Sequence, residues 1–367
     1  MSWLGKAAAV LVGCGAAYNV LATAGAFRFR RKNKLPDFTP PVSILKPVRG
    51  RDPHFYEAIR SHALQRYPEF ELIFGTANPE DAAVTDIERL RAEFPRLPVR
   101  IVYTANDAAN GKVGSLEILA RDARHSVLLV NDSDILVAPD YLLRVIGMLA
   151  DSGTGLVTCL YRGRGSSLAS KAEALGIATE FAPSVLVARL LSAGGFALGS
   201  TMAFRAADLE AIGGFAAIRE YLADDYQLGA RIAALGKQVA LADTVVETNL
   251  GDGSWRDVWM HQVRWSRTIR ISRPSGYFGY LVTQATFWCV VAALNGYPRV
   301  ALAGIVVRLV AAAASMRALD YPLNALLLVP VRDLFGLAVW AAGMVGNTVE
   351  WRGIRFRLLS DGRIRPL

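Results

Sequence analysis

Hydrophobic and polar residues divide the chain into apolar ends and an alternating middle. Residues 7–27 are almost all apolar or small, and about twenty such residues span the hydrocarbon core of a bilayer. Five basic residues follow at once, namely Arg28, Arg30, Arg31, Lys32 and Lys34. A cleaved signal peptide carries its charge before the apolar run. This order therefore favours a transmembrane helix over residues 1–27 and a basic linker over 28–41 on the cytoplasmic side.

Between residues 42 and 250 the pattern alternates between strand-like runs and helical spacing. Short apolar runs predict strands at 42–47, 71–77, 99–103, 126–130, 155–160, 200–204, 238–241 and 245–248. Helical spacing predicts helices at 53–66, 82–94, 113–122, 139–150, 206–212 and 223–235. Alternation of this kind predicts an α/β domain with a mostly parallel sheet and right-handed crossovers.

The C-terminal third returns to membrane-like sequence. Residues 251–275 mix basic and aromatic residues at helical spacing, which is typical of an amphipathic interface helix. Within residues 276–350, apolar blocks at 280–294, 300–315 and 323–345 are candidate spans, interrupted by Arg308, Arg332 and Asp333. Charge inside a bilayer is costly unless it is paired.

The side of the C-terminus is left open by two conflicting signals. The basic tail at 351–367 favours a cytoplasmic C-terminus. Three spans after a cytoplasmic domain place the same tail outside. The conflict disappears if one of the three blocks lies in the membrane interface.

Composition supports a mixed protein. The chain is 53% hydrophobic and 20% charged, with mean hydropathy +0.28, which predicts one soluble domain plus membrane segments. A net charge of +9 suits an anionic nucleotide or an acidic membrane leaflet. No aromatic-basic motif indicates nucleic acid, and the spacing of Cys14, Cys159 and Cys289 supports neither a disulfide framework nor a zinc site.

The candidate chemistry centres on two carboxylates that follow the apolar run at 126–130. Ligands of open α/β sheets bind at the carboxyl ends of the strands, where Asp132 and Asp134 stand one residue apart. Such oxygen ligands suit Mg²⁺ or Mn²⁺ bound to a diphosphate, although an Asp-rich turn is the alternative. Asp224 and Asp225 open a predicted helix, where the helix dipole alone favours carboxylates. No glycine-rich dinucleotide or Walker motif supports a dehydrogenase or kinase.

Further motifs extend over nearly the whole chain. They comprise residues 42–47 with Gly50, 67–68, Asp81, 112–113, 132–134, 139–142, 157–163, 223–226 and 264–265. Together these motifs resemble the ceramide glucosyltransferase family, family 21, including its bacterial relatives that glycosylate hopanoids. The resemblance implies a nucleotide-diphospho-sugar (GT-A) transferase fold over residues 42–250, flanked by transmembrane helices.

The resemblance also implies roles for individual residues. Asp81 is expected at the nucleotide base, and Asp132 and Asp134 are expected to bind the sugar nucleotide with Mg²⁺ or Mn²⁺. Asp225, with Asp224 beside it, is expected to be the general base that deprotonates an acceptor hydroxyl. One base without a carboxylate nucleophile implies displacement with inversion.

The last motif departs from the family pattern. The family has Gln or Arg, two residues, and then Arg-Trp, whereas this chain begins the motif with His261. By resemblance, Arg264 meets the diphosphate and Trp265 lines the acceptor site; membrane anchoring is the alternative for Trp265. Lys112 is expected to reach the nucleotide, or else to be a solvated helix start.

These features predict a multi-pass inner-membrane enzyme with its catalytic domain in the cytoplasm. It is expected to transfer a hexose from a UDP-sugar to a lipid hydroxyl, with no nucleic-acid partner. N-acetylglucosaminyl transfer to a hopanoid lipid, a processive polysaccharide synthase and a catalytically inactive scaffold are the alternatives. The sequence leaves open whether the acceptor is ceramide, a hopanoid or diacylglycerol, and which UDP-sugar is the donor.

Overall fold

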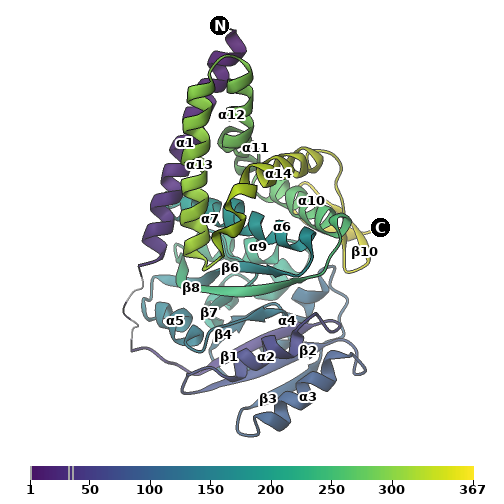
Figure 1. The fold of residues 1–367 in the computed structure, drawn as a ribbon. Helices are drawn as coiled ribbons and strands as arrows, with labels where there is room; N and C mark the ends of the chain where they lie inside the picture. Colours follow the sequence, from purple (N-terminus) through teal and green to yellow (C-terminus); the bar gives the residue numbers. More distant parts are fainter. Residues whose placement is uncertain (1, 32–33, 35–36) are drawn as a thin grey trace. The chain divides into compact units, whose positions relative to one another are not determined.

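The computed structural model describes residues 2–31, 34 and 37–367, which form two compact units (Figure 1). The helical unit comprises Met1–Lys32, Arg162–Gly194 and Leu250–Asp361, and the sheet unit comprises Asn33–Tyr161, Gly195–Asn249 and Gly362–Leu367. Residues 162–194 therefore leave the continuous domain expected over 42–250. They do so because Leu175 and Ala178 pack against Ala312 and Met316 in an apolar cluster of the helical unit.

The sheet unit is built on an eight-stranded sheet in the order β3-β2-β1-β4-β7-β6-β8-β5. The strands are β1 (Val42–Val48), β2 (Phe70–Thr76), β3 (Val99–Tyr103), β4 (Val127–Val130), β5 (Ile135–Leu136), β6 (Thr154–Gly165), β7 (Met202–Arg205) and β8 (Gln238–Gly251). Strands β3, β2, β1 and β4 are parallel, whereas β7 runs antiparallel to β4 and β6, and β5 antiparallel to β8. The expected α/β fold with a mostly parallel sheet is confirmed. The two strands expected at 238–241 and 245–248 are one strand, β8.

The connections of the parallel strands explain how the sheet is covered. The helices of this unit are α2 (Phe55–Ala63), α3 (Ala83–Glu93), α4 (Gly111–Asp122), α5 (Tyr141–Gly147), α8 (Ala206–Ala211) and α9 (Asp224–Ala234). β1, β2 and β3 follow one another in one direction, and the chain then returns to place β4 on the other side of β1. Right-handed crossovers therefore put α2 and α3 on one face and α4 on the other. The order reverses between β1 and β4, which is where open α/β sheets bind ligands.

Alternating side chains on the strands form the core of this unit. Leu45, Ile73 and Leu128 face Leu116 of α4 and Leu228 of α9 in a buried cluster. Because successive strand residues point to opposite faces, their buried neighbours Ile44, Leu72 and Leu129 point to the other face of the sheet. This two-sided burial is typical of parallel sheets.

The helical unit contains α1 (Trp3–Phe29), α6 (Leu168–Gly176), a π-helix η2 (Ile177–Phe181), α7 (Ala182–Leu190), α10 (Trp255–Ser272), α11 (Pro274–Thr283), α12 (Ala285–Leu294), α13 (Pro298–Ala318), η4 (Leu323–Leu328) and α14 (Val329–Gly343). Within the described residues, three stretches are long and apolar enough to cross a membrane: Trp3–Phe29, Pro298–Ala318 and Leu323–Gly343. The pair α11 and α12 passes the same test but bends by 41°. The tail, expected only to be basic, forms a hairpin of β9 (Thr348–Trp351) and β10 (Ile354–Leu358).

The charges inside the apolar C-terminal blocks are paired, as expected. Two guanidinium nitrogens of Arg308 donate to the carboxylate of Asp333 at 2.9 and 2.6 Å. Arg308 also donates to the carbonyl oxygen of Thr179 in the π-helix at 3.0 Å. Arg332 pairs with Glu180 at 3.1 Å and donates to the amide oxygen of Gln262 at 2.9 Å. This network satisfies charges that are costly inside a bilayer.

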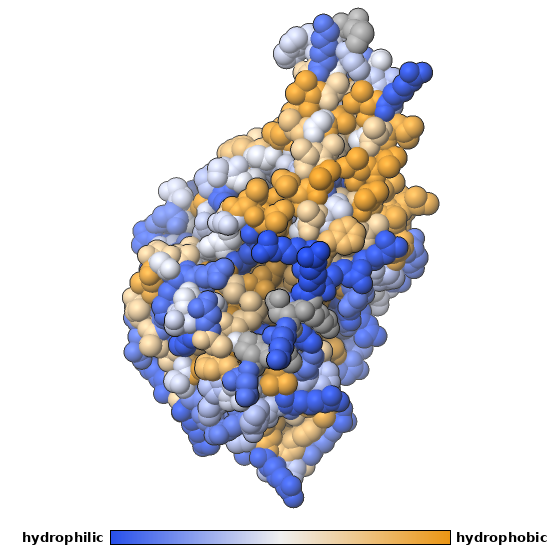
Figure 2. Space-filling model, turned by 90° about the vertical axis from the view of Figure 1, so that its left-hand side faces the viewer, coloured by the Kyte–Doolittle hydropathy of each residue, from blue (hydrophilic) through white to orange (hydrophobic). Residues whose placement is uncertain are grey.

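The surface of the helical unit is consistent with a membrane environment. Figure 2 shows hydrophobic side chains gathered over the long helices, with hydrophilic residues bordering this region at both ends. Exposed large apolar residues include Val20 and Phe27 on α1 and Leu302, Val306 and Val310 on α13. An apolar surface of this extent marks contact with lipid or with a partner.

Candidate functional site

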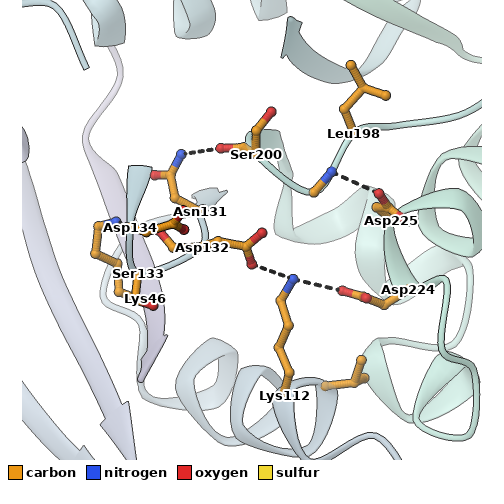
Figure 3. Close-up of polar contacts among 12 residues, drawn as sticks. Lys46, Lys112, Asn131, Asp132, Ser133, Asp134, Leu198, Ser200, Asp224 and Asp225 are labelled. Carbon is orange, nitrogen blue, oxygen red and sulfur yellow. Dashed lines mark hydrogen bonds and ion pairs between the residues drawn. The ribbon is translucent and has the colours of Figure 1, made fainter. Parts of the chain in front are cut away.

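The site is built at the end of β4, next to the point where the strand order reverses. Asn131 is buried, and its amide nitrogen donates to the carbonyl oxygen of Ser200 at 2.9 Å (Figure 3). The same nitrogen donates to the hydroxyl of Tyr141, also at 2.9 Å. The amide oxygen of Asn131 lies 3.1 Å from Nε2 of His62, which is also buried. These bonds fix the loop that begins at the strand end, so Asp132 and Asp134 project from a held backbone.

Lys112 joins two of the predicted carboxylates. It lies in the first turn of α4, and its ammonium is 2.7 Å from Asp132 and 3.3 Å from Asp224 (Figure 3). Its side chain is only 16% exposed, which contradicts the alternative of a solvated helix start. Burial by itself lowers the pKa of Lys112, but the charges of Asp132 and Asp224 outweigh burial and raise it. Lys112 is therefore a fixed cation between the loop after β4 and the start of α9.

Asp225 lies in the first turn of α9 beside these residues. Its carboxylate accepts hydrogen bonds from the backbone N–H of Gly199 at 2.9 Å and of Tyr226 at 2.7 Å. A Cβ atom at position 199 would lie 3.4 Å from Asp225 Oδ2 and 3.6 Å from Asp132 Oδ2. Two carboxylates from distant parts of the chain thus flank one point. Burial, followed by the charge of Asp224, raises the pKa of Asp225 to about 6.

Asp134 is a further carboxylate of this site, and its surroundings indicate an excess of negative charge. Its side chain accepts a hydrogen bond from Thr248 of β8. Burial and then the neighbouring charge of Asp132 raise its pKa to about 6, so a bound cation would relieve a real electrostatic cost. Among the described residues no group of three or more His, Cys, Asp or Glu side chains converges on one point. Asp132 and Asp134 fit a divalent ion whose remaining ligands come from a diphosphate and water.

Lys46 is a residue of the site for which the sequence predicted no role. It stands in β1 with its side chain fully buried, and its ammonium donates to the backbone carbonyl of Asp132 at 3.1 Å. Burial lowers the pKa of Lys46 to about 7, although the charges of Asp134 and Asp132 oppose this. A lysine inside a strand made mostly of apolar residues was the available signal, because a buried lysine needs a partner.

Asp81 is held at the same edge of the sheet. Its carboxylate accepts from the backbone N–H of Gly50 at 2.7 Å and of Ala83 at 3.0 Å, so it stabilises the start of α3. Gly50 has φ of +73°, a conformation that glycine adopts without strain. In the same loop after β1, Asp52 accepts a hydrogen bond from Ser133. The loops after β1, β2 and β4 are therefore tied together.

The predicted Arg-Trp motif lies on α10 in the helical unit. The ring nitrogen Nδ1 of His261 is 2.7 Å from Glu173 Oε1, and the rings of His261 and Trp265 are 4.6 Å apart. Phe181 of the π-helix lies 6.4 Å from the Trp265 ring. Glu173, which the sequence did not single out, is the acidic partner of His261. Because α10 and the carboxylates belong to different units, joint action of His261, Arg264 and Trp265 with them stays a prediction.

A family model described as "Glycosyl transferase family 21" matches residues 6–364. The chain belongs to glycosyltransferase family 21. Ceramide glucosyltransferase 1 of Caenorhabditis elegans is 24% identical over 359 residues, covering 92% of this chain and 76% of that protein. A ceramide glucosyltransferase of Komagataella phaffii is 27% identical over 131 residues, covering 33% and 25%.

A solved structure supports the same fold. A mannosyltransferase from Pyrobaculum calidifontis, in complex with GDP-Man and Mn²⁺, superposes with a TM-score of 0.58 at 20% identity. The match covers 93% of this chain and 97% of that one. The predicted GT-A-like fold and the prediction of a glycosyltransferase are confirmed.

Proposed function

We propose that this family 21 enzyme transfers a hexose from a UDP-sugar to the hydroxyl of a membrane lipid; the relatives named ceramide glucosyltransferases support this proposal. The main support is that the carboxylates of Asp225 and Asp132 lie 3.4 and 3.6 Å from one point, the position that a Cβ atom on Gly199 would occupy. That point stands at the ligand-binding edge of the sheet. A donor sugar held on Asp132 is thereby placed next to a base.

Asp225 has the properties that a general base requires. A lipid hydroxyl is a poor nucleophile at neutral pH, so a positioned carboxylate must accept its proton during attack. A pKa of about 6 leaves Asp225 ionised at pH 7 and more basic than an ordinary aspartate. The two backbone N–H bonds fix the carboxylate. Direct attack on the anomeric carbon, with no carboxylate nucleophile, inverts its configuration.

We assign the remaining carboxylates and Lys112 to binding of the donor nucleotide. Asp132 and Asp134 would hold Mg²⁺ or Mn²⁺, which supplies charge neutralisation on the departing diphosphate when bound. The Mn²⁺ in the mannosyltransferase complex supports this assignment. Lys112, already a cation between Asp132 and Asp224, would exchange part of that pairing for the diphosphate. Asp81 would contact the uridine base.

Helix α10 contributes the residues that we assign to the acceptor site. We assign Arg264 to the diphosphate and Trp265 to the wall of the acceptor site, with His261 held by Glu173 beside the Trp265 ring. A lipid chain leaves the bilayer at a cost of about 0.8 kcal/mol per CH₂. A basic and aromatic helix at the membrane interface therefore lets the enzyme reach a hydroxyl that stays in the membrane.

The helices support a definite topology. The stretch Leu323–Gly343 is long and apolar enough to cross a membrane, but only its last 15 residues form the α-helix α14, which is about 22 Å long against the roughly 30 Å hydrocarbon core. In Figure 1, α14 runs beside α10, and Trp259 lies 5.8 Å from Phe335 across them. We place α14 with α10 in the interface, which leaves the bent pair α11–α12 and α13 as the C-terminal spans. Two spans return the basic tail to the cytoplasm, with the sheet unit, at the inner membrane.

Release of UDP tests the proposal directly. The detergent-solubilised protein is incubated with UDP-glucose, UDP-galactose or UDP-N-acetylglucosamine and with ceramide, hopanoid or diacylglycerol, with and without Mn²⁺. Lipid-stimulated, metal-dependent UDP release, with a glycolipid of inverted anomeric configuration by mass spectrometry and NMR, is the expected result. A long polymer would show a polysaccharide synthase. Absence of release with every pair would refute the proposal.

A further inference from the structure

A shallow apolar groove runs between α1 and α13. Val20, Ala24 and Phe27 line it from α1, and Val306 and Val310 line it from α13. The two helices run in the same direction: a Cβ at Gly5 would meet the backbone of Asn295, just before α13 begins, and one at Gly304 would meet Val12. Both C-termini therefore lie at the same end of the groove.

That end carries a group of arginines. Arg30 is the C-cap residue of α1 and Arg31 follows it, three and four residues after Phe27, and Arg317 lies in the last turn of α13, seven residues after Val310 on the same face. At 1.5 Å per residue, Arg30 stands about 5 Å beyond Phe27 along α1 and Arg317 about 10 Å beyond Val310 along α13. Because the Cα–Cβ bonds of a helix tilt toward its N-terminus, the Arg317 side chain leans back toward the apolar lining.

These arginines have no acidic partner in the part of the chain that the structure describes. All three are exposed, and no ion pair joins Arg30, Arg31 or Arg317 to a described carboxylate. Residues 20–31 and 300–319 contain no Asp or Glu. The first acidic residue is Asp320, which uses its backbone carbonyl to accept from Arg162.

We propose that this groove and its arginine end form a binding site for one anionic phospholipid of the bilayer, separate from the glycosyl acceptor. An acyl chain lies along Val20–Phe27 and Val306–Val310, and the phosphate meets Arg30, Arg31 and Arg317. An apolar slot beside unpaired cations matches the two chemical parts of such a lipid. Arginine suits the phosphate because its planar fork donates two parallel hydrogen bonds.

Native mass spectrometry of the full chain tests the site, with dioleoyl phosphatidylglycerol and dioleoyl phosphatidylcholine as probes. We expect one retained phosphatidylglycerol and no retained phosphatidylcholine. Each of R30Q, R31Q and R317Q should weaken phosphatidylglycerol retention about fivefold, since a basic residue near an anionic lipid surface contributes roughly this factor. The matched controls K6Q and R299Q lie at the opposite ends of α1 and α13 and should retain the lipid.

A second variant separates the groove from the charges. V310W fills the apolar slot and leaves every arginine in place, and it should also release the lipid while the protein stays monodisperse in size-exclusion chromatography. Equal retention of both probes, unchanged retention in R30Q, R31Q and R317Q, or displacement of phosphatidylglycerol by ceramide would overturn the proposal. Displacement by glycerol phosphate alone would show a free-phosphate site instead. None of these measurements depends on glycosyl transfer.

Discussion

The molecule contains two groups of charged side chains that are built on different principles. In the sheet unit, Asp132 and Asp224 share the single ammonium of Lys112, and the Asp132 side chain is 43% exposed. In the helical unit, Arg308 and Asp333 pair one to one through two hydrogen bonds, with side chains 8% and 6% exposed. The first group has more carboxylates than lysine charges in contact with them; the second is neutral.

The difference indicates what each group does. Burial, and then the charge of a neighbouring carboxylate, raises the pKa of Asp134 and of Asp225, and perturbed groups of this kind concentrate where chemistry occurs. A matched and bidentate pair leaves no capacity for a ligand and instead holds helices together. Gly336 fits this interpretation, because a Cβ there would meet Glu180 at 2.7 Å and Arg332 at 3.0 Å.

The strongest test of the comparison is D225N. The variant keeps the shape of the side chain but removes its ability to accept a proton, so the transfer rate should fall by about 10²- to 10⁴-fold. Binding of the UDP-sugar, measured by calorimetry, should be retained. D107N serves as the control, because the Asp107 side chain is 94% exposed. Turnover within tenfold of the parent would exclude Asp225 as the base.

Breaking the neutral pair should affect stability and not chemistry. In D333N, Arg308 stays buried without its counter-charge, and the free energy of unfolding should fall by about 3–5 kcal/mol. Thermal unfolding in detergent measures this. The double variant R308M/D333L removes both charges and should regain most of the stability, with the transfer rate per folded molecule unchanged. A D333N variant as stable as the parent would contradict a structural role for the pair of Arg308 and Asp333.

Removing the shared cation of the sheet unit should weaken donor binding. K112M takes away a charged hydrogen-bond donor, worth about 1.5–3 kcal/mol or roughly 10- to 100-fold in affinity for the UDP-sugar. The KM for the donor should rise more than kcat falls. K112R keeps the charge and should lie between K112M and the parent. An unchanged KM in K112M would remove Lys112 from the donor site.

The pH dependence sharpens the interpretation of the excess charge. Because Asp225 must be ionised to accept a proton and its pKa is about 6, kcat should fall about tenfold per pH unit below pH 6 and level off above it. D224N removes the neighbouring negative charge that helps to raise this pKa. The acid limb should therefore move to lower pH in D224N. A limb that does not move would show that Asp224 acts only through Lys112.

The smallest effect is expected at His261. H261Q replaces the residue by one that the family motif carries, and the glutamine amide can still donate to Glu173, so only part of the interaction is lost. A two- to tenfold decrease in kcat/KM is expected, corresponding to about 0.5–1.5 kcal/mol. E173Q should give a similar change if the pair acts as a unit, and the double variant should then be no worse than either single one. Additive losses would separate the two residues.

Elements with a strong local pattern were predictable. The strand predicted at 99–103 is β3 with the same ends, and the helix predicted over residues 1–27 is α1, Trp3–Phe29. The break predicted inside β8 was wrong because Asp243 is polar but pairs with Arg144 at 3.3 Å, so the strand continues through it. The tail hairpin turns at Arg352 and Gly353, both with positive φ. Two such residues make a tight hairpin turn, and the basic composition hid it.

The amino-acid sequence by itself determined the membrane-like ends, the α/β alternation and the positions of Asp132, Asp134 and Asp225, because each depends on neighbours along the chain. Only the tertiary structure decided that Lys112 joins Asp132 to Asp224, that Lys46 is buried under the same loop, and that Arg308 meets Asp333. The physical reason is that ion pairs and pKa shifts depend on distance and burial in space. Those quantities arise when strands and helices from distant positions pack together.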